Sequence, residues 1–281
     1  MFIKNTFKFI ARNPRLVLMA LIPALPLGFF ASPSAIIPFL FNYKPSSGNT
    51  LTIGKALHQL FPMHEHPLWV LLLIPLAFVF CAVIFGISEH KMRVGNYGFR
   101  NFFQSFFQRM NFSVTALIIP FILVCILYTL WLFLSACVLV FFEFICFKLM
   151  GSAALSVIFV AVFTVLLYLL LIWMFSLLLL WPPVTLVSGY GVMDSWFYQL
   201  RLLEGRMFKF TVSIALVFFI NGALVTSFGL FLGRYAMAAV SAVCFTFMII
   251  YLIGLAMTAY FDLSGTARKD IKIKYYLRKH E

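Results

Sequence analysis

The chain has 281 residues, of which 64% are hydrophobic and only 10% are charged, and its mean hydropathy is +1.05. A soluble domain carries about 25% charged residues, so this composition excludes a soluble protein and indicates an integral membrane protein. In such a protein the net charge of +13 favours contact with anionic lipid headgroups and argues against a nucleic-acid partner.

Six apolar runs are long enough to cross a bilayer, since a helix needs about 20 apolar residues to span the hydrocarbon layer. None of them has Lys, Arg, Asp or Glu at its centre, where one such residue costs about 3 kcal/mol. We therefore predict an all-α polytopic membrane protein with six transmembrane helices in three hairpins. The six runs are 16–41, 68–88, 113–142, 152–181, 211–232 and 236–261.

The first run differs from the others because it contains Pro23, Pro26, Pro33 and Pro38. Each interior proline removes a backbone hydrogen bond, which predicts a kinked or broken helix that neighbouring helices screen from lipid. The alternative is a signal peptide cleaved near residue 31. We disfavour it because the apolar run continues to Phe41, beyond the length of such a segment.

Basic residues predict the orientation of the helices. If the N-terminus is cytoplasmic, 17 basic residues lie on the cytoplasmic side and four lie outside. This asymmetry predicts a multi-pass protein of the cytoplasmic (inner) membrane with both termini in the cytoplasm. The 17 are Lys4, Lys8, Arg12, Arg15, Lys91, Arg93, Arg100, Arg109, Arg201, Arg206, Lys209, Arg268, Lys269, Lys272, Lys274, Arg278 and Lys279. The four are Lys44, Lys55, Lys148 and Arg234.

The stretch 97–112, "YGFRNFFQSFFQRMNF", separates the second run from the third. On a helix its phenylalanines share one side and its arginines and amides the other, and it is too short and too polar to span. We predict an interfacial helix with phenylalanines in the acyl boundary and arginines at the phosphates. The membrane-interface candidates here are Phe99, Phe102, Phe103, Phe106, Arg100 and Arg109, with Met110 on the apolar side.

The same pattern recurs in 190–210 and at the N-terminus, where Ile3, Phe7 and Ile10 share a side opposite Lys4, Lys8 and Arg12. The chain therefore reads as a single transmembrane domain of three pseudo-repeats, each an interfacial amphipathic helix followed by two spans. The repeats cover about 1–90, 95–182 and 188–262, and a basic tail covers 263–281. The interface candidates in the third repeat are Met193, Trp196, Phe197, Leu200 and Arg201.

The segments "NYGFRNFFQSFFQRMNFSVTALIIP" and "SGYGVMDSWFYQLRLLEGRMFKFTVSIALVF" resemble the YciC-type bacterial membrane proteins and the membrane domain of some glycerophosphodiester phosphodiesterases. Each has a glycine, a short amphipathic helix with Ser or Gln in mid-face, a basic turn and a span. The resemblance covers about 90–235 and implies an all-helical bundle of six spans. It brings no catalytic residues, because the phosphodiesterase chemistry belongs to a soluble domain of those fusions.

Motifs that carry chemistry are scarce. His64, Glu65 and His66 in the external loop are weak metal candidates, since i, i+2 spacing between prolines fits a solvated turn better than a metal site. The five cysteines form no CxxC pair. The sequence has no phosphate-binding loop, no serine nucleophile elbow and no pair of carboxylates at a spacing suited to general acid–base catalysis. We therefore expect no catalytic residue, no metal and no cofactor.

Asn221 is the only strongly polar side chain near the middle of a predicted span. It either lines a path for a substrate or hydrogen-bonds a neighbouring helix. We expect a non-enzymatic membrane protein that acts in envelope physiology through the bilayer, anionic lipids and a protein partner. The alternative is the permease subunit of an exporter, with 97–111 and 190–207 docked on a separate ATPase. A membrane-embedded enzyme ranks third.

Overall fold

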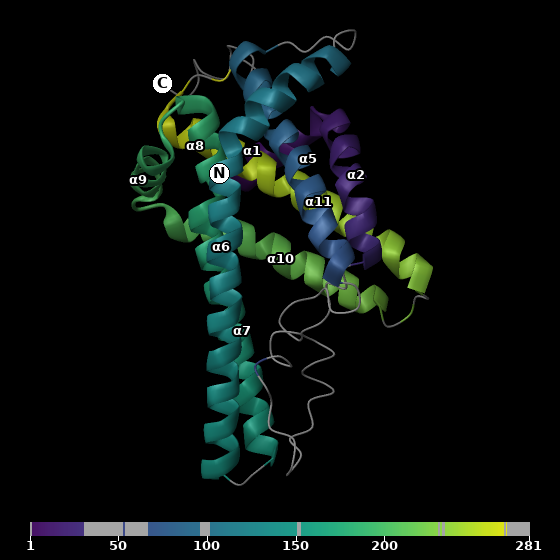
Figure 1. Cartoon of the computed structure of the whole chain (residues 1–281), viewed down its shortest axis with the longest axis vertical. Coiled ribbons are helices and arrows are strands. Elements are labelled where there is room, and N and C mark those ends of the chain that lie inside the picture. The colour runs from purple at the N-terminus through teal and green to yellow at the C-terminus, as the bar shows by residue number, and fades with distance from the viewer. Residues whose placement is uncertain are drawn as a thin grey trace.

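The computed structural model describes residues 2–30, 53, 67–95, 102–150, 153–229, 231, 234–266 and 268 (Figure 1). All regular secondary structure in these ranges is helical, which confirms the predicted all-α class. The helices are α1 (Phe2–Ala11), α2 (Pro14–Phe30), α5 (Pro67–Val94), α6 (Phe102–Met150), α7 (Ala153–Leu179), α8 (Trp181–Ser188), α9 (Val192–Leu203), α10 (Met207–Gly229) and α11 (Arg234–Ser264).

Five helical segments of the described part are long and apolar enough to cross a membrane, so the chain is a multi-pass membrane protein. A sixth is added if α1 and α2, which meet at 92°, count as one bent span. The predicted runs after the first each contribute one segment, whereas 31–41 of the first run lies outside the described residues. The five segments are Leu73–Val94, Phe112–Phe142, Val165–Ser188, Met207–Val225 and Tyr235–Ser264.

The C-terminal half of α11 forms the centre of the bundle. Every residue from Ile250 to Phe261 is buried, and α11 contacts α1, α2, α5, α8, α9 and α10. Its small residues allow neighbours to approach closely. A Cβ added at Gly254 would lie 3.3 Å from Thr6 Cγ2 of α1. Of the described helices, the first is therefore packed on the last.

The first predicted span packs differently from the expectation. Among the helices that α11 contacts, α2 packs against it most extensively, and a Cβ on Gly28 would lie only 2.5 Å from the Ala242 nitrogen. The helix continues through both Pro23 and Pro26, so its described part is not broken. Its screening is one-sided, because one face turns away from the bundle. The exposed side chains of that face are Leu18, Ile22 and Leu25.

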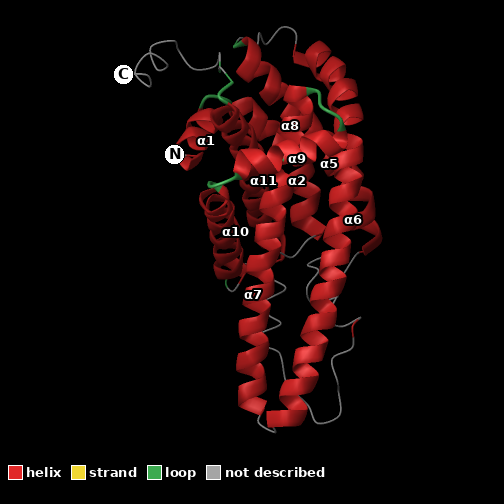
Figure 2. Ribbon diagram, turned by 90° about the vertical axis from the view of Figure 1, so that its left-hand side faces the viewer, coloured by secondary structure: helices red, strands yellow, loops and turns green. Residues whose placement is uncertain are grey.

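The second predicted interfacial helix is not a separate element, because α6 runs without interruption from Phe102 to Met150. Its 49 residues would extend about 74 Å at 1.5 Å per residue. No glycine or proline occurs between Phe102 and Ile119, so nothing ends the helix before the span begins. Both views show α6 and α7 as a hairpin that extends beyond the other helices (Figures 1 and 2).

The fourth predicted run also divides differently, since α7 ends at Leu179 and a short helix α8 follows. Two prolines stand in the first turn of α8, where the missing N–H groups have no helical partner to lose. Gly189 ends α8 at φ +67°, and its amide donates to the Thr185 carbonyl. The chain then reverses into α9.

Candidate functional site

One end of the bundle gathers most of the described polar contacts between helices. It is formed by α1, α8, α9 and the C-terminal half of α11, together with the start of α2, the end of α5 and the start of α10, and we call it the basic end. Its exposed charged side chains are predominantly basic: the only exposed acids among the described residues are Asp194 and Glu204. The exposed basic side chains are Lys4, Lys8, Arg12, Arg15, Arg93, Arg201, Arg206 and Lys209.

The N-terminal helix α1 packs on the bundle with a side that the sequence analysis did not single out. Phe2, Thr6 and Phe9 are its buried residues, whereas Ile3 and Ile10 are half-buried and Phe7 is exposed. The reason lies in α11, where Gly254 leaves room for Thr6 and Phe9. The basic residues still lie on the outer side, as predicted.

Two polar contacts join α1 to the last turns of α11. The Asn5 amide donates to the Asp262 carboxylate at 2.7 Å. The hydroxyls of Thr6 and Thr258 are hydrogen-bonded at 3.2 Å, and both residues are fully buried. Each threonine hydroxyl can also donate to a carbonyl of its own helix, Phe2 or Gly254, so the bond between Asn5 and Asp262 is the more specific of the two contacts.

Two of the three buried side chains of α9 are polar, and several of its apolar side chains lie on the exposed surface together with Asp194 and Arg201. Its buried residues are Ser195, Gln199 and Leu203. Met193 is 69% exposed and Phe197 is 61% exposed. Neither polar atom of the Gln199 side chain has a hydrogen-bond partner among the described residues. In water this arrangement would be unfavourable, because apolar groups gain by leaving water and polar ones lose.

Aromatic contacts hold α9 against α8. The ring centroids of Trp181 and Trp196 are 5.1 Å apart, and the Trp181 indole N–H donates to the Val192 carbonyl at 3.1 Å. Of the five interface candidates in this repeat, Trp196 is thus half-buried against α8. The other four, Met193, Phe197, Leu200 and Arg201, lie on the exposed surface of α9.

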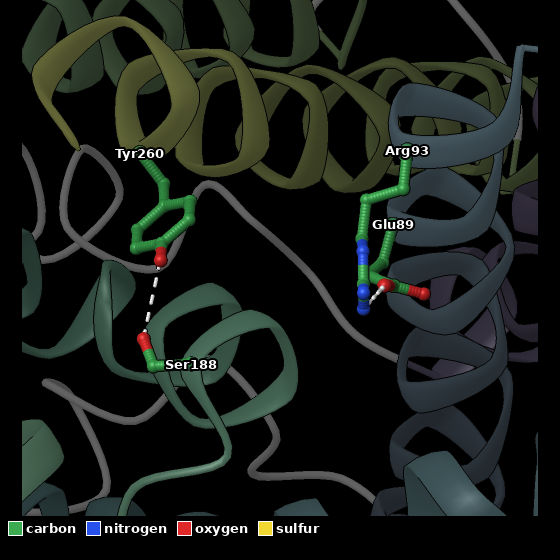
Figure 3. Close-up of polar contacts among 4 residues, drawn as sticks. All are labelled: Glu89, Arg93, Ser188 and Tyr260. Atoms are coloured by element: carbon green, nitrogen blue, oxygen red, sulfur yellow. Dashed lines mark hydrogen bonds and ion pairs between the residues drawn. The ribbon is translucent and has the colours of Figure 1, made fainter. Parts of the chain in front are cut away.

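Figure 3 shows two further contacts at this end, neither of which the sequence predicted. Glu89 at the end of α5 is buried, and its carboxylate accepts a hydrogen bond of 2.8 Å from Arg93, whose side chain is 56% exposed. The hydroxyls of Ser188 on α8 and Tyr260 on α11 are hydrogen-bonded at 3.1 Å. The spacing of Glu89 and Arg93, i and i+4, was the available signal for the first contact.

Asn221 lies on the side of α10 that packs against α11. Its side chain is buried, and its Nδ2 donates to the Met248 sulfur at 3.5 Å. The contact joins two neighbouring spans. Of the two roles considered for Asn221, it corresponds to a hydrogen bond with a neighbouring helix.

The other predicted residues are not placed. Phe99 and Arg100, like the loop with His64, Glu65 and His66, lie outside the described residues. The backbone of Phe102, Phe103, Phe106 and Arg109 is part of α6, but their side chains lie outside the description.

No protein family model, characterised protein or solved structure matches the chain. The resemblance to the YciC-type proteins therefore stays a prediction.

Proposed function

We propose that this membrane protein resides in the cytoplasmic membrane with both termini in the cytoplasm. It acts without catalysis in envelope physiology, through lipid and partner contacts made by its basic end. The observation that carries the proposal is the helix α9, which turns Ser195 and Gln199 inward and leaves Met193 and Phe197 exposed. Such a helix suits an apolar medium outside the bundle, which at this end is the acyl boundary of a bilayer.

The energetics favour lipid over water around α9. Full burial of a Met or Phe side chain contributes about 1.5–3 kcal/mol, and partial insertion contributes less. Arg201 is exposed one turn further along the same helix, where it reaches phosphate groups as its neighbours enter the acyl region.

The bend between α1 and α2 supports the same placement of the basic end at the membrane surface. A single bent span of α1 and α2 would carry Lys4, Lys8, Arg12 and Arg15 into the membrane, at a cost of about 3 kcal/mol for each central charge. The 92° bend avoids that cost if α2 crosses the membrane and α1 lies in the interface.

The test uses a cysteine-free variant in liposomes, with an environment-sensitive fluorophore attached at Phe197→Cys. We expect quenching by lipids spin-labelled in the acyl chain and little quenching by aqueous iodide. The matched control is Glu204→Cys, at the exposed turn after α9, which iodide should quench fully. Equal iodide quenching at both sites would show that α9 faces water, and the proposal would fail.

The second candidate is the permease subunit of an exporter. Its support is the exposed turn Glu204–Arg206, whose Gly205 has φ +69° and separates α9 from α10 at the surface. A charged turn of this kind suits docking on a separate ATPase. Purification in mild detergent distinguishes the candidates: a co-purifying ATPase that protects the probe at residue 204 favours the permease.

A further inference from the structure

A pair of tyrosines lies where the chain passes from α8 into α9, at the edge of the bundle (Figure 1). The rings of Tyr190, in the connection, and Tyr198, on α9, meet edge to face with centroids 5.5 Å apart. Tyr190 is 49% exposed and Tyr198 is half-buried. The pair follows the C-terminus of α8, which Gly189 caps. Aromatic faces and the C-terminus of a helix both attract positive charge.

The carboxylate of Asp194 lies beside this pair. A Cβ added at Gly191, the residue after Tyr190, would lie 3.5 Å from Asp194 Oδ2, so the carboxylate turns back toward the connection. Tyr198 follows Asp194 by four residues and is therefore its neighbour one turn along α9. Asp194 is exposed, and its side chain has no hydrogen-bond or ion-pair partner among the described residues. The carboxylate and the rings together favour a cation, at an end of the bundle that is otherwise predominantly basic.

Arg201 lies beyond Tyr198 on the same side of α9. It follows Tyr198 by three residues and Asp194 by seven, about 10.5 Å along the axis at 1.5 Å per residue. Its side chain is exposed and likewise has no partner in the part of the chain that the structure describes. The helix dipole alone accounts for an acid in the first turn and a base in the last, so the tyrosine pair beside Asp194 is the distinguishing feature.

We propose that this side of α9 binds the zwitterionic headgroup of phosphatidylethanolamine. Its ammonium lies at Asp194 against the rings of Tyr190 and Tyr198, and its phosphate lies at Arg201. The proposal rests on the proposed function, which puts the neighbouring Phe197 in the acyl boundary, and deepens it by naming a lipid class. A primary ammonium donates hydrogen bonds to a carboxylate, whereas the trimethylammonium of phosphatidylcholine has no N–H. The site therefore selects a primary amine over its methylated analogue.

Native mass spectrometry of the full chain in detergent tests the site, with phosphatidylethanolamine, phosphatidylcholine or phosphatidylglycerol of the same acyl chains added. We expect one phosphatidylethanolamine to bind about fivefold more tightly than either of the others, the upper range for an exposed ion pair. Equal binding of phosphatidylethanolamine and phosphatidylcholine would overturn the proposal. Displacement of the lipid by ethanolamine phosphate would also contradict it, because it would indicate a soluble ligand.

Variants of Asp194 test the carboxylate. Asp194→Asn should weaken phosphatidylethanolamine about fivefold without weakening phosphatidylglycerol, and Asp194→Glu should retain the binding because it keeps the charge. The matched control is Glu204→Gln, which removes the other exposed carboxylate of the described residues and should bind as the parent does. If Asp194→Asn binds like this control, the proposal fails, and the exposed carboxylate belongs to a contact with a basic protein partner.

Variants of Tyr198 test the ring. Tyr198→Leu should weaken phosphatidylethanolamine about threefold, the contribution of an exposed cation–π contact, whereas Tyr198→Phe keeps the ring and should bind like the parent. Equal losses in both variants would refute the role of the rings. Acyl-chain quenching at Phe197 without a preference for phosphatidylethanolamine would overturn this proposal alone. Iodide quenching at Phe197 would overturn the proposed function, so the two failures are distinguishable.

Discussion

The side-chain amide of Asn5 lies 2.7 Å from the carboxylate of Asp262, across 257 residues of sequence. This hydrogen bond ties the first helix to the last turn of α11, next to the buried contact of Thr6 with Thr258. A hydrogen bond to a charged group contributes about 1.5–3 kcal/mol, and partial exposure of this pair lowers that figure.

Variants of Asn5 should therefore loosen α1. We expect Asn5→Ala to lower the stability of the purified protein by about 1 kcal/mol, because Asp262 loses its donor. Asn5→Asp should cost more, because it places two carboxylates together. Asp262→Asn should cost least, since an amide also accepts the bond. Thermal melting in detergent measures the order, and a stable Asn5→Asp variant would contradict the contact.

The contact between α2 and α11 predicts a graded glycine series. Gly28→Ala should cost about 1–3 kcal/mol, because its Cβ would overlap the backbone of Ala242. Gly254→Ala should cost less, since the neighbouring side-chain atoms lie at 3.3 Å or beyond. Gly222→Ala is the control, with nothing within 4 Å, and should be neutral or stabilising because alanine favours helix. Melting temperatures that do not follow this order would contradict the packing of α2 on α11.

The buried carboxylate of Glu89 predicts coupling with Arg93. Arg93→Ala should cost no more than about 1 kcal/mol, because the arginine is largely exposed and its ion pair is screened. Adding Glu89→Gln to Arg93→Ala should recover most of that loss, since the side chain at position 89 then carries no charge for Arg93 to balance. A double-mutant cycle of chemical or thermal stability measures this coupling. Strictly additive effects would show that the pair is not energetically linked.

The charge asymmetry predicts the topology. A reporter active only in the cytoplasm should be active when fused at Glu281 and silent when inserted near Ser47, because basic loops stay inside. An active insertion near Ser47 would contradict the orientation and, with it, the cytoplasmic placement of the basic end.

The apolar runs of the sequence predict the spans well because hydropathy depends only on the residues within each run. The position at which a helix ends depends on single residues, whose effect is harder to predict from the sequence. In the third predicted repeat Gly205, at φ +69°, separates α9 from α10, and the predicted short helix exists there. The corresponding stretch of the second predicted repeat, "FFQRMNFSV", has no such glycine, so helix and span merge into α6.

Periodicity alone could not predict which side of each helix packs against the rest of the bundle. The sequence shows that α1 has apolar residues on more than one side, but only the partner selects the side that is buried. Gly254 on α11 accepts Thr6 and Phe9, and this choice rotates Phe7 outward. Glu89 was missed for a related reason: it ends an apolar run, where a carboxylate looks like an ordinary interfacial residue until packing buries it.

The buried segment Ile250–Phe261 has a consequence for biogenesis. Because α11 follows every other described helix in the chain, each helix that packs around it leaves the ribosome before its partner exists. At roughly 5–20 residues per second, α1 waits on the order of 10–50 s for Gly254 to arrive. During that interval the nascent chain holds Thr6 and Phe9 without their final neighbours. We therefore expect a chain that terminates before α11 to insert its earlier spans without completing the bundle.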